Sequence, residues 1–101
     1  MDRMPIIIDQ QQATEMLSLL DGWKLVDAGI EKEFNFSDFV SAFDFMGQVG
    51  KLAEQQNHHP DWFNSYNHLL IILTTHEVGG ITERDFKLAK TIDKLIYVSK
   101  Q

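Results

Sequence analysis

The chain has 101 residues, which is enough for one domain and too short for a second hydrophobic core of ordinary size. It contains no cysteine, so disulfides, thiolate nucleophiles and cysteine-based zinc sites are excluded. The formal net charge is −6, and the nine basic residues are scattered along the sequence. Direct binding of nucleic acid or of an anionic membrane is therefore disfavoured, because both partners need a concentrated basic surface.

No segment long enough to cross a membrane is predicted. The only uninterrupted apolar run near the N-terminus is residues 6–8, between Pro5 and Asp9, and it is too short for a signal peptide or a membrane span. We therefore expect one cytoplasmic domain over residues 1–101, and a chain of 11.7 kDa is small enough to diffuse into the nucleus as well. So small a domain buries a modest fraction of its surface, which favours oligomerisation.

The first part of the sequence predicts a short helix and a β-hairpin. Residues 9–20 have a helical apolar stripe, and Asp9 is a suitable N-cap for it. Strands are predicted at residues 23–26 and 30–36, joined by a glycine-containing turn. Apolar and polar residues alternate along the second strand, which indicates one buried and one solvated face. Lys32 is the exception, because it falls among the apolar residues of the buried face.

The longest predicted helix covers residues 38–56, with Ser37 as its N-cap. Its apolar arc is wider than that of an ordinary amphipathic helix and contains Phe39, Ala42, Phe43, Phe45, Met46, Val49, Gly50, Leu52 and Ala53. One sheet face would cover only part of this arc, so we expect a second subunit to cover the rest. Gly47 and Gly50 support this, because mid-helix glycine costs about 1 kcal/mol and close helix–helix approach is one reason to keep it. The alternative is that both glycines fit beneath a bulky neighbour within the same core.

The second part of the sequence predicts another hairpin and a final helix. A short strand at residues 62–65 and a turn at 66–67 lead into a long strand at 69–75 that is apolar on both faces. Residues 82–85 form a capping-box pattern for a helix that extends to about residue 99. The order helix, hairpin, helix, hairpin, helix predicts an α+β sandwich, with antiparallel strands and the helices gathered on one face.

All four histidines lie between positions 58 and 76. Histidine titrates near neutral pH, so such a cluster indicates acid–base chemistry or metal binding. Glu54 lies one helical turn before His58, where its carboxylate could orient the imidazole ring. His59 precedes Pro60, which favours an extended backbone and should direct its ring away from His58. Two adjacent histidines that point in different directions can contact two edges of one small molecule.

Other interpretations of the histidines stay open from the residues alone. The segment 58–60 could be only a polar helix stop, and His76 at the end of the long strand could be structural. His68 is expected to face solvent or to be structural. A zinc site of His58, His59 and His76 is conceivable, but adjacent residues rarely bind one metal and the His-Glu-x-x-His helix motif is missing. The residues alone thus predict a histidine-lined pocket and leave its reaction undefined.

The spacing of these residues resembles the signature of the pterin-4a-carbinolamine dehydratase family. The signature residues in this chain, each at the family's spacing, are Glu54, His58-His59-Pro60, Tyr66, His76 and Asp85. The segments 59–64 and 75–77 look like those of the animal-type members, and Gly22-Trp23 before the first strand also fits. The resemblance covers nearly the whole chain and is most specific around the histidines.

The resemblance implies a four-stranded antiparallel sheet with three helices packed on one face. It also implies dimers or tetramers, with the long helix at residues 38–56 in a helical bundle between subunits. The implied reaction is dehydration of 4a-hydroxytetrahydropterin, the product left when an aromatic amino acid hydroxylase uses tetrahydrobiopterin, to quinonoid dihydropterin. This hydro-lyase reaction needs an acid near the leaving hydroxyl and a base near N5, and it requires neither a metal nor a redox cofactor.

By the same resemblance, His58 and His76 share the proton transfers and His59 mainly holds the substrate. Which of the two histidines is the acid and which the base does not follow from the sequence. We expect Glu54 to orient His58. Asp85 is expected to support His76, to cap the final helix, or to do both.

The pterin itself is expected to lie between the segments 57–59 and 74–77, whose backbone groups would form hydrogen bonds with its amide-like edge. The residues expected to line this site are Asn57, His58, His59, Pro60, Trp62, Thr74, Thr75, His76 and Glu77. Trp62 could equally belong to the core or to a subunit interface.

Animal members of the family are also known as binding partners of the dimerisation region of a homeodomain transcription factor. The alternative hypothesis is therefore an interaction protein, a dimerisation cofactor that acts through the long-helix face of Phe39, Phe43, Met46 and Gly50. The two roles use different surfaces, and the complete set of pocket residues favours the enzyme. A metal-dependent hydrolase is a third hypothesis. Metal analysis of the purified protein would distinguish it from the other two.

Overall fold

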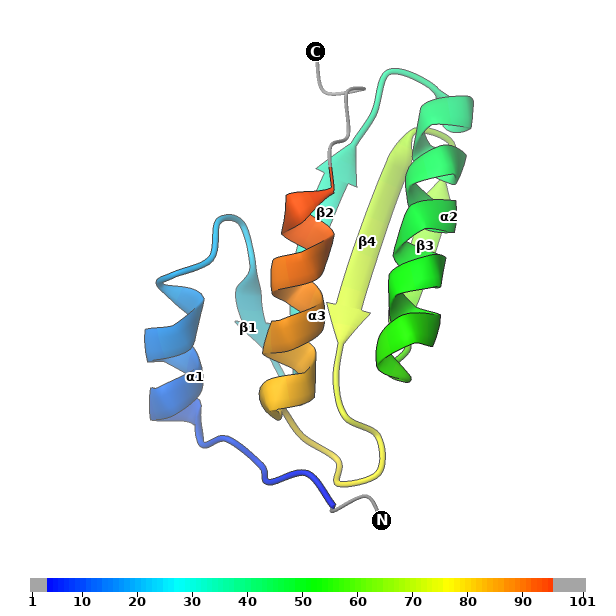
Figure 1. The fold of residues 1–101 in the computed structure, drawn as a ribbon. Helices are drawn as coiled ribbons and strands as arrows, with labels where there is room; N and C mark the ends of the chain where they lie inside the picture. Colours follow the sequence, from blue (N-terminus) through cyan, green and yellow to red (C-terminus); the bar gives the residue numbers. More distant parts are fainter. Residues whose placement is uncertain (1–3, 96–101) are drawn as a thin grey trace.

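The structure is a computed structural model that describes residues 4–95. Within this range, three helices and four strands follow one another along the chain (Figure 1). In chain order they are α1 Gln10–Leu17, β1 Lys24–Val26, β2 Gly29–Asn35, α2 Phe39–Gln56, β3 Asp61–Ser65, β4 His68–Leu73 and α3 Glu83–Lys94. The predicted order of helix, hairpin, helix, hairpin, helix is confirmed.

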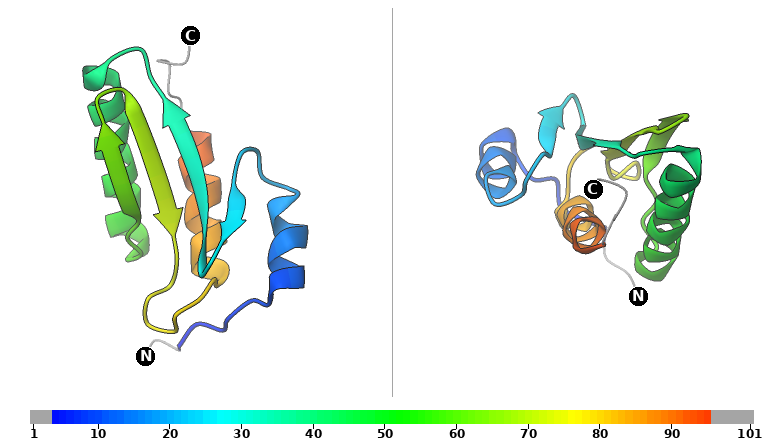
Figure 2. Two further views of the ribbon diagram at one scale, coloured as in Figure 1. Left: turned by 180° about the vertical axis from the view of Figure 1, so that it is seen from behind. Right: turned by 90° about the horizontal axis from the view of Figure 1, so that it is seen from above.

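The four strands form one antiparallel sheet in the order β1-β2-β4-β3. Strands β2 and β4, which are far apart in the sequence, pair in the middle, and β1 and β3 form the edges. All three helices lie on the same face of the sheet, as the view from above shows most clearly (Figure 2). The α+β class, with a four-stranded antiparallel sheet and three helices on one face, is therefore confirmed.

Side-chain alternation along β4 explains how the sheet joins the core. Leu69, Ile71 and Leu73 are buried beneath the helices, whereas Leu70 and Ile72 point to the other face and are half-buried. Strand β4 pairs with β2 on one side and with β3 on the other. The strand that is apolar on both faces is thus a central strand of the sheet.

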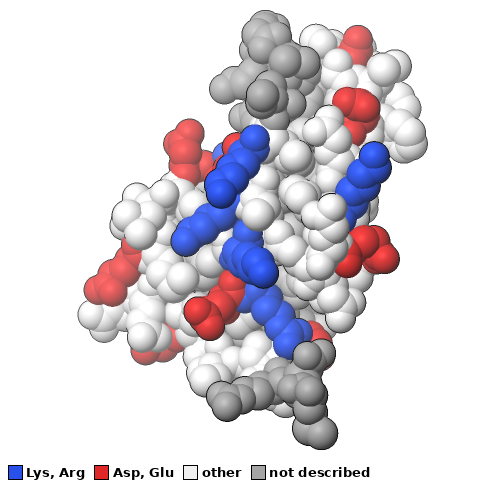
Figure 3. All heavy atoms as spheres, in the orientation of Figure 1, with Lys and Arg blue, Asp and Glu red and all other residues white. Residues whose placement is uncertain are grey.

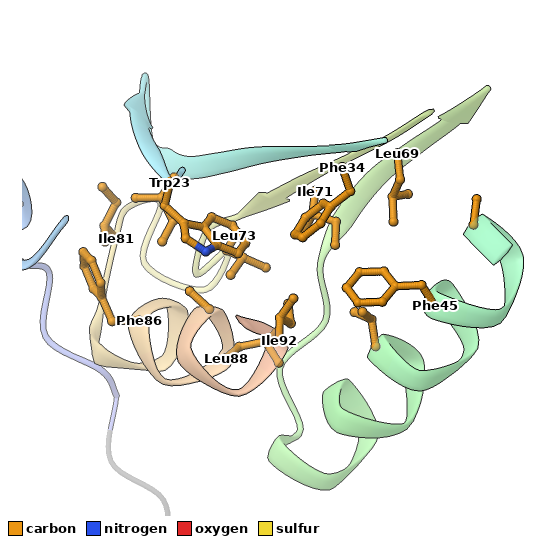
Figure 4. Packing of buried hydrophobic residues seen from close by; sticks show 14 of the residues in the cluster. Trp23, Phe34, Phe45, Leu69, Ile71, Leu73, Ile81, Phe86, Leu88 and Ile92 are labelled. Atoms are coloured by element: carbon orange, nitrogen blue, oxygen red, sulfur yellow. The ribbon is translucent and has the colours of Figure 1, made fainter. Parts of the chain in front are cut away.

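The hydrophobic core lies between the sheet and the helices (Figure 4). Phe45 of α2 packs against Phe34 and Phe36, with ring centroids 5.1 and 5.3 Å apart. Phe86 and Ile92 of α3 are buried in the same core. Full burial of one large apolar side chain contributes about 1.5–3 kcal/mol, so these contacts fix the positions of α2 and α3 on the sheet.

Lys32 lies on the buried face of β2, where its charge has a partner. Its Nζ atom lies 3.0 Å from Oδ1 of Asp93 and 5.2 Å from the centre of the Phe34 ring. The indole N–H of Trp23 donates to the same carboxylate at 3.0 Å. The exception in the alternation of β2 is thus a partly buried ion pair, because a charge beneath the helices needs a counter-charge.

Helix α2 begins one residue later than predicted, and its N-cap is Asp38 instead of Ser37. The Asp38 carboxylate accepts a hydrogen bond from the backbone N–H of Ser41 at 2.8 Å. This bond, together with one from the Ser41 hydroxyl, holds the pKa of Asp38 below its ordinary value of 3.8. Ser37 therefore lies outside the helix.

The apolar arc of α2 is divided between the core and the surface. Ala42, Phe45, Val49 and Ala53 are buried. Phe39 and Phe43 are exposed. A Cβ atom on Gly47 or Gly50 would meet no described atom within 4 Å beyond its own helix backbone and chain neighbours. The alternative that these glycines fit beneath a bulky core neighbour is therefore wrong.

The helices are shorter than predicted. Helix α1 ends at Leu17 rather than at residue 20, and α3 ends at Lys94, where Leu95 has an extended backbone. The last part of the predicted final helix, residues 96–99, lies outside the described residues. Over residues 4–95, no helix combines the length and the apolar character that crossing a membrane requires.

The strands are shifted by one or two residues, and the long strand shows why. It spans residues 68–73 instead of the predicted 69–75. Its pairing with β2 ends at the pair of Leu73 with Ile30, because β2 itself begins at Gly29. Beyond this point the hydroxyl of Thr74 donates to a carbonyl in the β1–β2 turn at 2.5 Å. Thr75 then forms a separate bridge with Gly80. The chain thus leaves the sheet just before the segment that carries His76.

Basic residues gather on the outer side of α3, contrary to the scattered distribution that the sequence suggests (Figure 3). Arg84, Lys87, Lys90 and Lys94 follow one another at intervals of three or four residues. They therefore share one side of the helix. Together with Met16 of α1 they line a groove of about 460 Å³.

Candidate functional site

A pocket lies where the C-terminus of α2 meets the start of β3 and the loop between β4 and α3. Its volume is about 300 Å³, at the lower end of the range for small-molecule sites. The residues that line it are Asn57, His58, His59, Pro60, Asp61, His76 and Glu77. The fold thus brings two separate segments of the chain, each with histidines, to one place.

Asn57 directs the two adjacent histidines to different sides. It is the C-cap of α2 and has a left-handed backbone, with φ 51° and ψ 44°, which asparagine tolerates better than most residues. The backbone N–H of His58 then donates to the carbonyl of Ala53 at 3.0 Å, and the His58 side chain is buried. His59 remains exposed. The predicted divergence of the two rings is confirmed.

His58 is the buried histidine of the site and is held by Asp85 of α3. Only 6% of the His58 side chain and 0% of the Asp85 side chain are exposed, and Nε2 lies 2.6 Å from Oδ1. An ionised carboxylate can only accept, so Nε2 carries the hydrogen and Nδ1 is the unprotonated nitrogen of the neutral ring. An imidazole oriented in this way by a buried carboxylate is suited to accept a proton.

Asp85 is also part of the capping box that starts α3. Its Oδ2 atom accepts from the backbone N–H of Thr82 and from the hydroxyl of Thr75, both at 2.9 Å. The two roles expected of Asp85, a cap and a partner for a histidine, therefore coexist. The histidine that it contacts is His58 and not His76, which corrects the expectation.

His59 is paired with Glu54. Its Nε2 lies 2.5 Å from Oε2 of Glu54, and 54% and 78% of the two side chains are exposed. The expected pairing of Glu54 with His58 is wrong, because the left-handed residue between them turns His58 inward and leaves His59 over the last helical turn. An exposed pair of this kind contributes about 0–1 kcal/mol, so it orients the ring more than it stabilises the fold.

His76 is the third histidine of the pocket, and its partner is Asp61. Nε2 of His76 lies 3.0 Å from Oδ2 of Asp61, and more than half of each side chain is exposed. No sequence pattern predicts Asp61 as a site residue. The one signal for it is its place directly after Pro60, inside a segment that resembles the family.

Glu77 lines the pocket next to the groove on α3. Its Oε2 atom accepts a hydrogen bond from Nη1 of Arg84 at 3.1 Å. The backbone N–H of Glu77 itself, and in addition the Arg84 guanidinium, lower the pKa of this carboxyl from its ordinary value of 4.5. The carboxylate is therefore ionised at neutral pH and adds negative charge beside the histidines.

Several residues expected in the site lie outside the pocket. Trp62 on the edge strand β3 does not line it, and neither do Thr74 and Thr75. The hydroxyl of Thr74 bonds to the β1–β2 turn, and Thr75 is buried behind Asp85. His68 starts β4 at the end of the strand remote from the pocket. It has no place in the site, as predicted.

The three pocket histidines share one arrangement. Each has its Nε2 atom within 3.0 Å of a different carboxylate. Within residues 4–95, no group of three or more histidine, aspartate or glutamate side chains converges as a metal site would require. The pocket is thus equipped with imidazole–carboxylate pairs, the groups that general acid–base catalysis most often uses.

Comparison with known proteins agrees with this site. A model of the family described as pterin 4 alpha carbinolamine dehydratase matches residues 7–95. A protein of Rhizobium johnstonii assigned to the pterin-4-alpha-carbinolamine dehydratases is 49% identical over 96 residues, which cover 93% of this chain and 91% of that protein. A Prochlorococcus marinus protein with the same assignment is 46% identical over 93 residues, or 92% of this chain and 98% of that one.

A solved structure has the same fold. It is the crystal structure of a transcriptional coactivator/pterin dehydratase from Brucella melitensis, which is 41% identical and superimposes with a TM-score of 0.83. The match covers 87% of this chain and 96% of that one. With the signature histidines gathered in one pocket and nearly the whole length matched, the chain belongs to the pterin-4a-carbinolamine dehydratase family.

Proposed function

We propose that the histidine pocket at the end of α2 catalyses the reaction of the family, the dehydration of a 4a-hydroxytetrahydropterin to a quinonoid dihydropterin. The chain is accordingly a hydro-lyase. The observation that carries the proposal is the convergence of three imidazole–carboxylate pairs, one buried and two exposed, around one small pocket. Imidazoles can both give and take a proton near neutral pH, which is what this reaction needs.

The reaction transfers two protons and breaks the C4a–O and N5–H bonds. The C4a–O bond breaks as the hydroxyl takes up a proton and leaves as water. The proton on N5 is removed, and its electron pair forms the C4a=N5 double bond of the product. One proton is delivered and one is taken, so no oxidant or reductant is consumed and the protein needs one acid and one base.

The geometry suggests how the histidines divide this work. We assign the base to His58, because Asp85 keeps its Nδ1 unprotonated in the neutral ring. We assign the acid to His76, which is open to solvent and can take up a proton from water between turnovers. His59, oriented by Glu54, is the residue that holds the substrate.

The test is the loss of the carbinolamine, generated in situ by an aromatic amino acid hydroxylase, in buffer with a metal chelator. We expect the wild-type protein to accelerate it and His76→Ala to lower kcat about 100-fold or more, the usual size of a general acid–base contribution. His68→Ala removes an imidazole outside the pocket and should leave kcat unchanged. No acceleration by folded wild-type protein, or equal losses in both variants, would contradict the proposal.

The proposal includes assembly of the chain into dimers or tetramers through α2. Phe39, Val40 and Phe43 are exposed on the outer side of this helix, and the rings of Phe39 and Phe43 stack at 5.6 Å. Gly47 and Gly50 leave open space on the helix, where a second helix could approach closely. Phe43→Glu should therefore reduce the particle mass measured by light scattering, and an unchanged mass would exclude this face as the interface.

The same face supports a second candidate function, that of a dimerisation cofactor for a transcription factor. The Brucella melitensis protein is described as both a coactivator and a pterin dehydratase. Phe43→Glu should weaken such binding and leave the histidine pocket intact, so the two functions can be separated. Tetrahydrobiopterin recycling in the cytoplasm, linked to an aromatic amino acid hydroxylase, is the context that we propose for the enzyme.

A further inference from the structure

Thr75 and Thr82 form a buried pair directly behind Asp85. Both residues are 0% exposed, and their hydroxyl oxygens are 2.7 Å apart. Thr75 lies where the chain leaves β4, and Thr82 is the N-cap of α3. Neither residue lines the histidine pocket, so neither has a direct contact with the space for the substrate.

The hydrogens of the two hydroxyl groups can be assigned from the partners of each oxygen. Oδ2 of Asp85 lies 2.9 Å from the Thr75 oxygen, and because an ionised carboxylate has no hydrogen, the Thr75 hydroxyl donates to it. The hydrogen between the two threonines must then come from Thr82. The Thr82 oxygen in turn accepts from the backbone N–H of Arg84 at 3.2 Å.

The reverse orientation leaves buried groups without partners. If Thr75 donated to Thr82, the oxygens of Thr75 and Asp85 would face each other at 2.9 Å with no hydrogen between them. The hydroxyl hydrogen of Thr82 would also be buried without an acceptor, which is unfavourable. In the first orientation every group has a partner. Thr82 donates to Thr75, and Thr75 donates to Oδ2 of Asp85. His58 donates to Oδ1, the other oxygen of Asp85.

Thr75 also fixes the turn that carries another histidine. Its backbone N–H donates to the carbonyl of Gly80 at 2.9 Å. Its carbonyl accepts from the N–H groups of Val78 and Gly79 at 3.1 and 3.0 Å. His76 is the next residue in this turn. The backbone of Thr75 thus positions His76, while its side chain acts on His58 through Asp85.

We infer that Thr75 and Thr82 are positioning residues for His58, because their directed pair of hydroxyl groups holds Asp85 as an acceptor and keeps the His58 hydrogen on Nε2. The effect of this on the reaction rate rests on the proposed function, but the effect on the histidine does not. Without the Thr75 hydroxyl, Oδ2 of Asp85 loses one of its two donors. The carboxylate can then rotate, and the His58 ring is no longer restricted to one tautomer.

The experiment compares Thr75→Val with Thr75→Ser. Valine has nearly the shape of threonine and no hydroxyl, whereas serine keeps the hydroxyl. Thr74→Val is the control, because it removes the neighbouring hydroxyl, which bonds elsewhere. The first readout is the pair of ring-nitrogen NMR shifts of His58 in protein without substrate, since these shifts distinguish the two tautomers. We expect a mixture of tautomers in Thr75→Val alone.

The second readout is the dehydration rate. Thr75→Val should lower kcat about 10- to 100-fold, the effect typical of residues that orient a functional side chain, and leave KM nearly unchanged. Thr75→Ser should restore most of the rate. A wild-type tautomer in folded Thr75→Val would overturn the inference whatever the rate. A changed tautomer in a protein whose wild type has no dehydratase activity would support the inference and contradict the proposed function.

The wild-type protein provides the test if Thr75→Val does not fold. Buried hydroxyl groups that donate hydrogen bonds exchange slowly with water, so both hydroxyl protons should give resolved NMR signals. The signal of the Thr82 hydroxyl proton should also show a close contact with the side chain of Thr75. A Thr75 hydroxyl that exchanges rapidly with water would overturn the inference.

Discussion

Two hollows in the described part of the molecule differ in size and in chemistry. The groove along α3 has a volume of about 460 Å³, and the histidine pocket has about 300 Å³. Size alone would favour the groove, because the largest well-formed pocket is the usual first candidate for a binding site. The chemistry of the side chains that line the two hollows instead favours the histidine pocket as the site.

Four of the eight side chains that line the groove are lysine or arginine, and none of the eight is a histidine. The pocket is lined by three histidines, each next to a carboxylate. A dehydration needs groups that can both give and take a proton. In this fold, the ability of the lining groups to transfer protons, and not the volume of the hollow, identifies the site.

The largest effect is expected from Asp85→Asn, which breaks the buried pair with His58. The amide NH2 group would meet either Nε2–H of His58 or, in the flipped orientation, the Thr75 hydroxyl and the Thr82 backbone N–H, and all of these are donors. Loss of a hydrogen bond to a buried charged group costs about 1.5–3 kcal/mol. Urea denaturation should therefore show a fall of this size in the free energy of unfolding, and kcat should fall as well.

Lys90→Ala in the groove is the control for Asp85→Asn. A surface substitution of this kind should change the free energy of unfolding by less than about 0.5 kcal/mol, and it should leave kcat unchanged. A loss of dehydratase activity in Lys90→Ala comparable with that in Asp85→Asn would mean that the groove takes part in the reaction.

A smaller effect is expected at Asn57, whose left-handed backbone separates His58 from His59. Asn57→Ala should lower the free energy of unfolding by about 1 kcal/mol and reduce kcat/KM, because alanine disfavours this conformation. Asn57→Gly should retain both values, since glycine adopts the conformation without strain. Equal losses in the two variants would show that the amide side chain, and not the backbone, is what the site requires.

Glu54→Gln should affect substrate binding more than stability. The pair with His59 is exposed, so the free energy of unfolding should change by less than about 1 kcal/mol. Because His59 is assigned to holding the substrate, KM should rise severalfold with kcat almost constant. Glu83→Gln, a carboxylate of the groove, is the comparison and should leave KM unchanged. A fall in kcat without a change in KM would contradict the role assigned to His59.

The smallest effect concerns Glu77, whose ion pair with Arg84 lies between the pocket and the groove. The pKa of Glu77 is lowered in the folded protein from its ordinary value of 4.5. Its ionised form therefore stabilises the fold above pH 4.5, and this contribution is lost as the pH falls through the lower folded pKa. In urea denaturation, wild type should be slightly more stable than Glu77→Gln at neutral pH, with the difference vanishing in acid. A difference that grew on acidification would contradict this sign.

The fold could be predicted because most elements carry their own local signal. Asp9 and the residues 82–85 cap helices as their sequence pattern predicts, and the alternation along β2 distinguishes its two faces. Element ends depend on contacts between distant residues. Strand β4 ends at Leu73 because its partner β2 begins at Gly29, and no local pattern around Leu73 reports where a distant strand begins.

The histidines of the site could be predicted from the sequence, but their partners could not. Spacing along a helix predicts a contact of Glu54 with His58. The left-handed backbone of Asn57 breaks this spacing, so Glu54 contacts His59 instead. The contact of His58 with Asp85 depends on where α3 packs against the end of α2. Asp61 meets His76 because the edge strand β3 begins beside the loop after β4. These pairings are properties of tertiary packing, which spacing along the chain does not encode.

The most direct test of the central claim is to locate a bound dihydropterin, a stable relative of the product. An NMR titration of the wild-type protein with 7,8-dihydrobiopterin would follow the backbone amide signals of both hollows. We predict shifts for residues 57–59, 61 and 76–77, which line the pocket, and none for residues 87–94, the part of α3 that contributes Lys87, Lys90, Thr91 and Lys94 to the groove. Shifts confined to residues 87–94 would place the ligand in the groove and contradict the account.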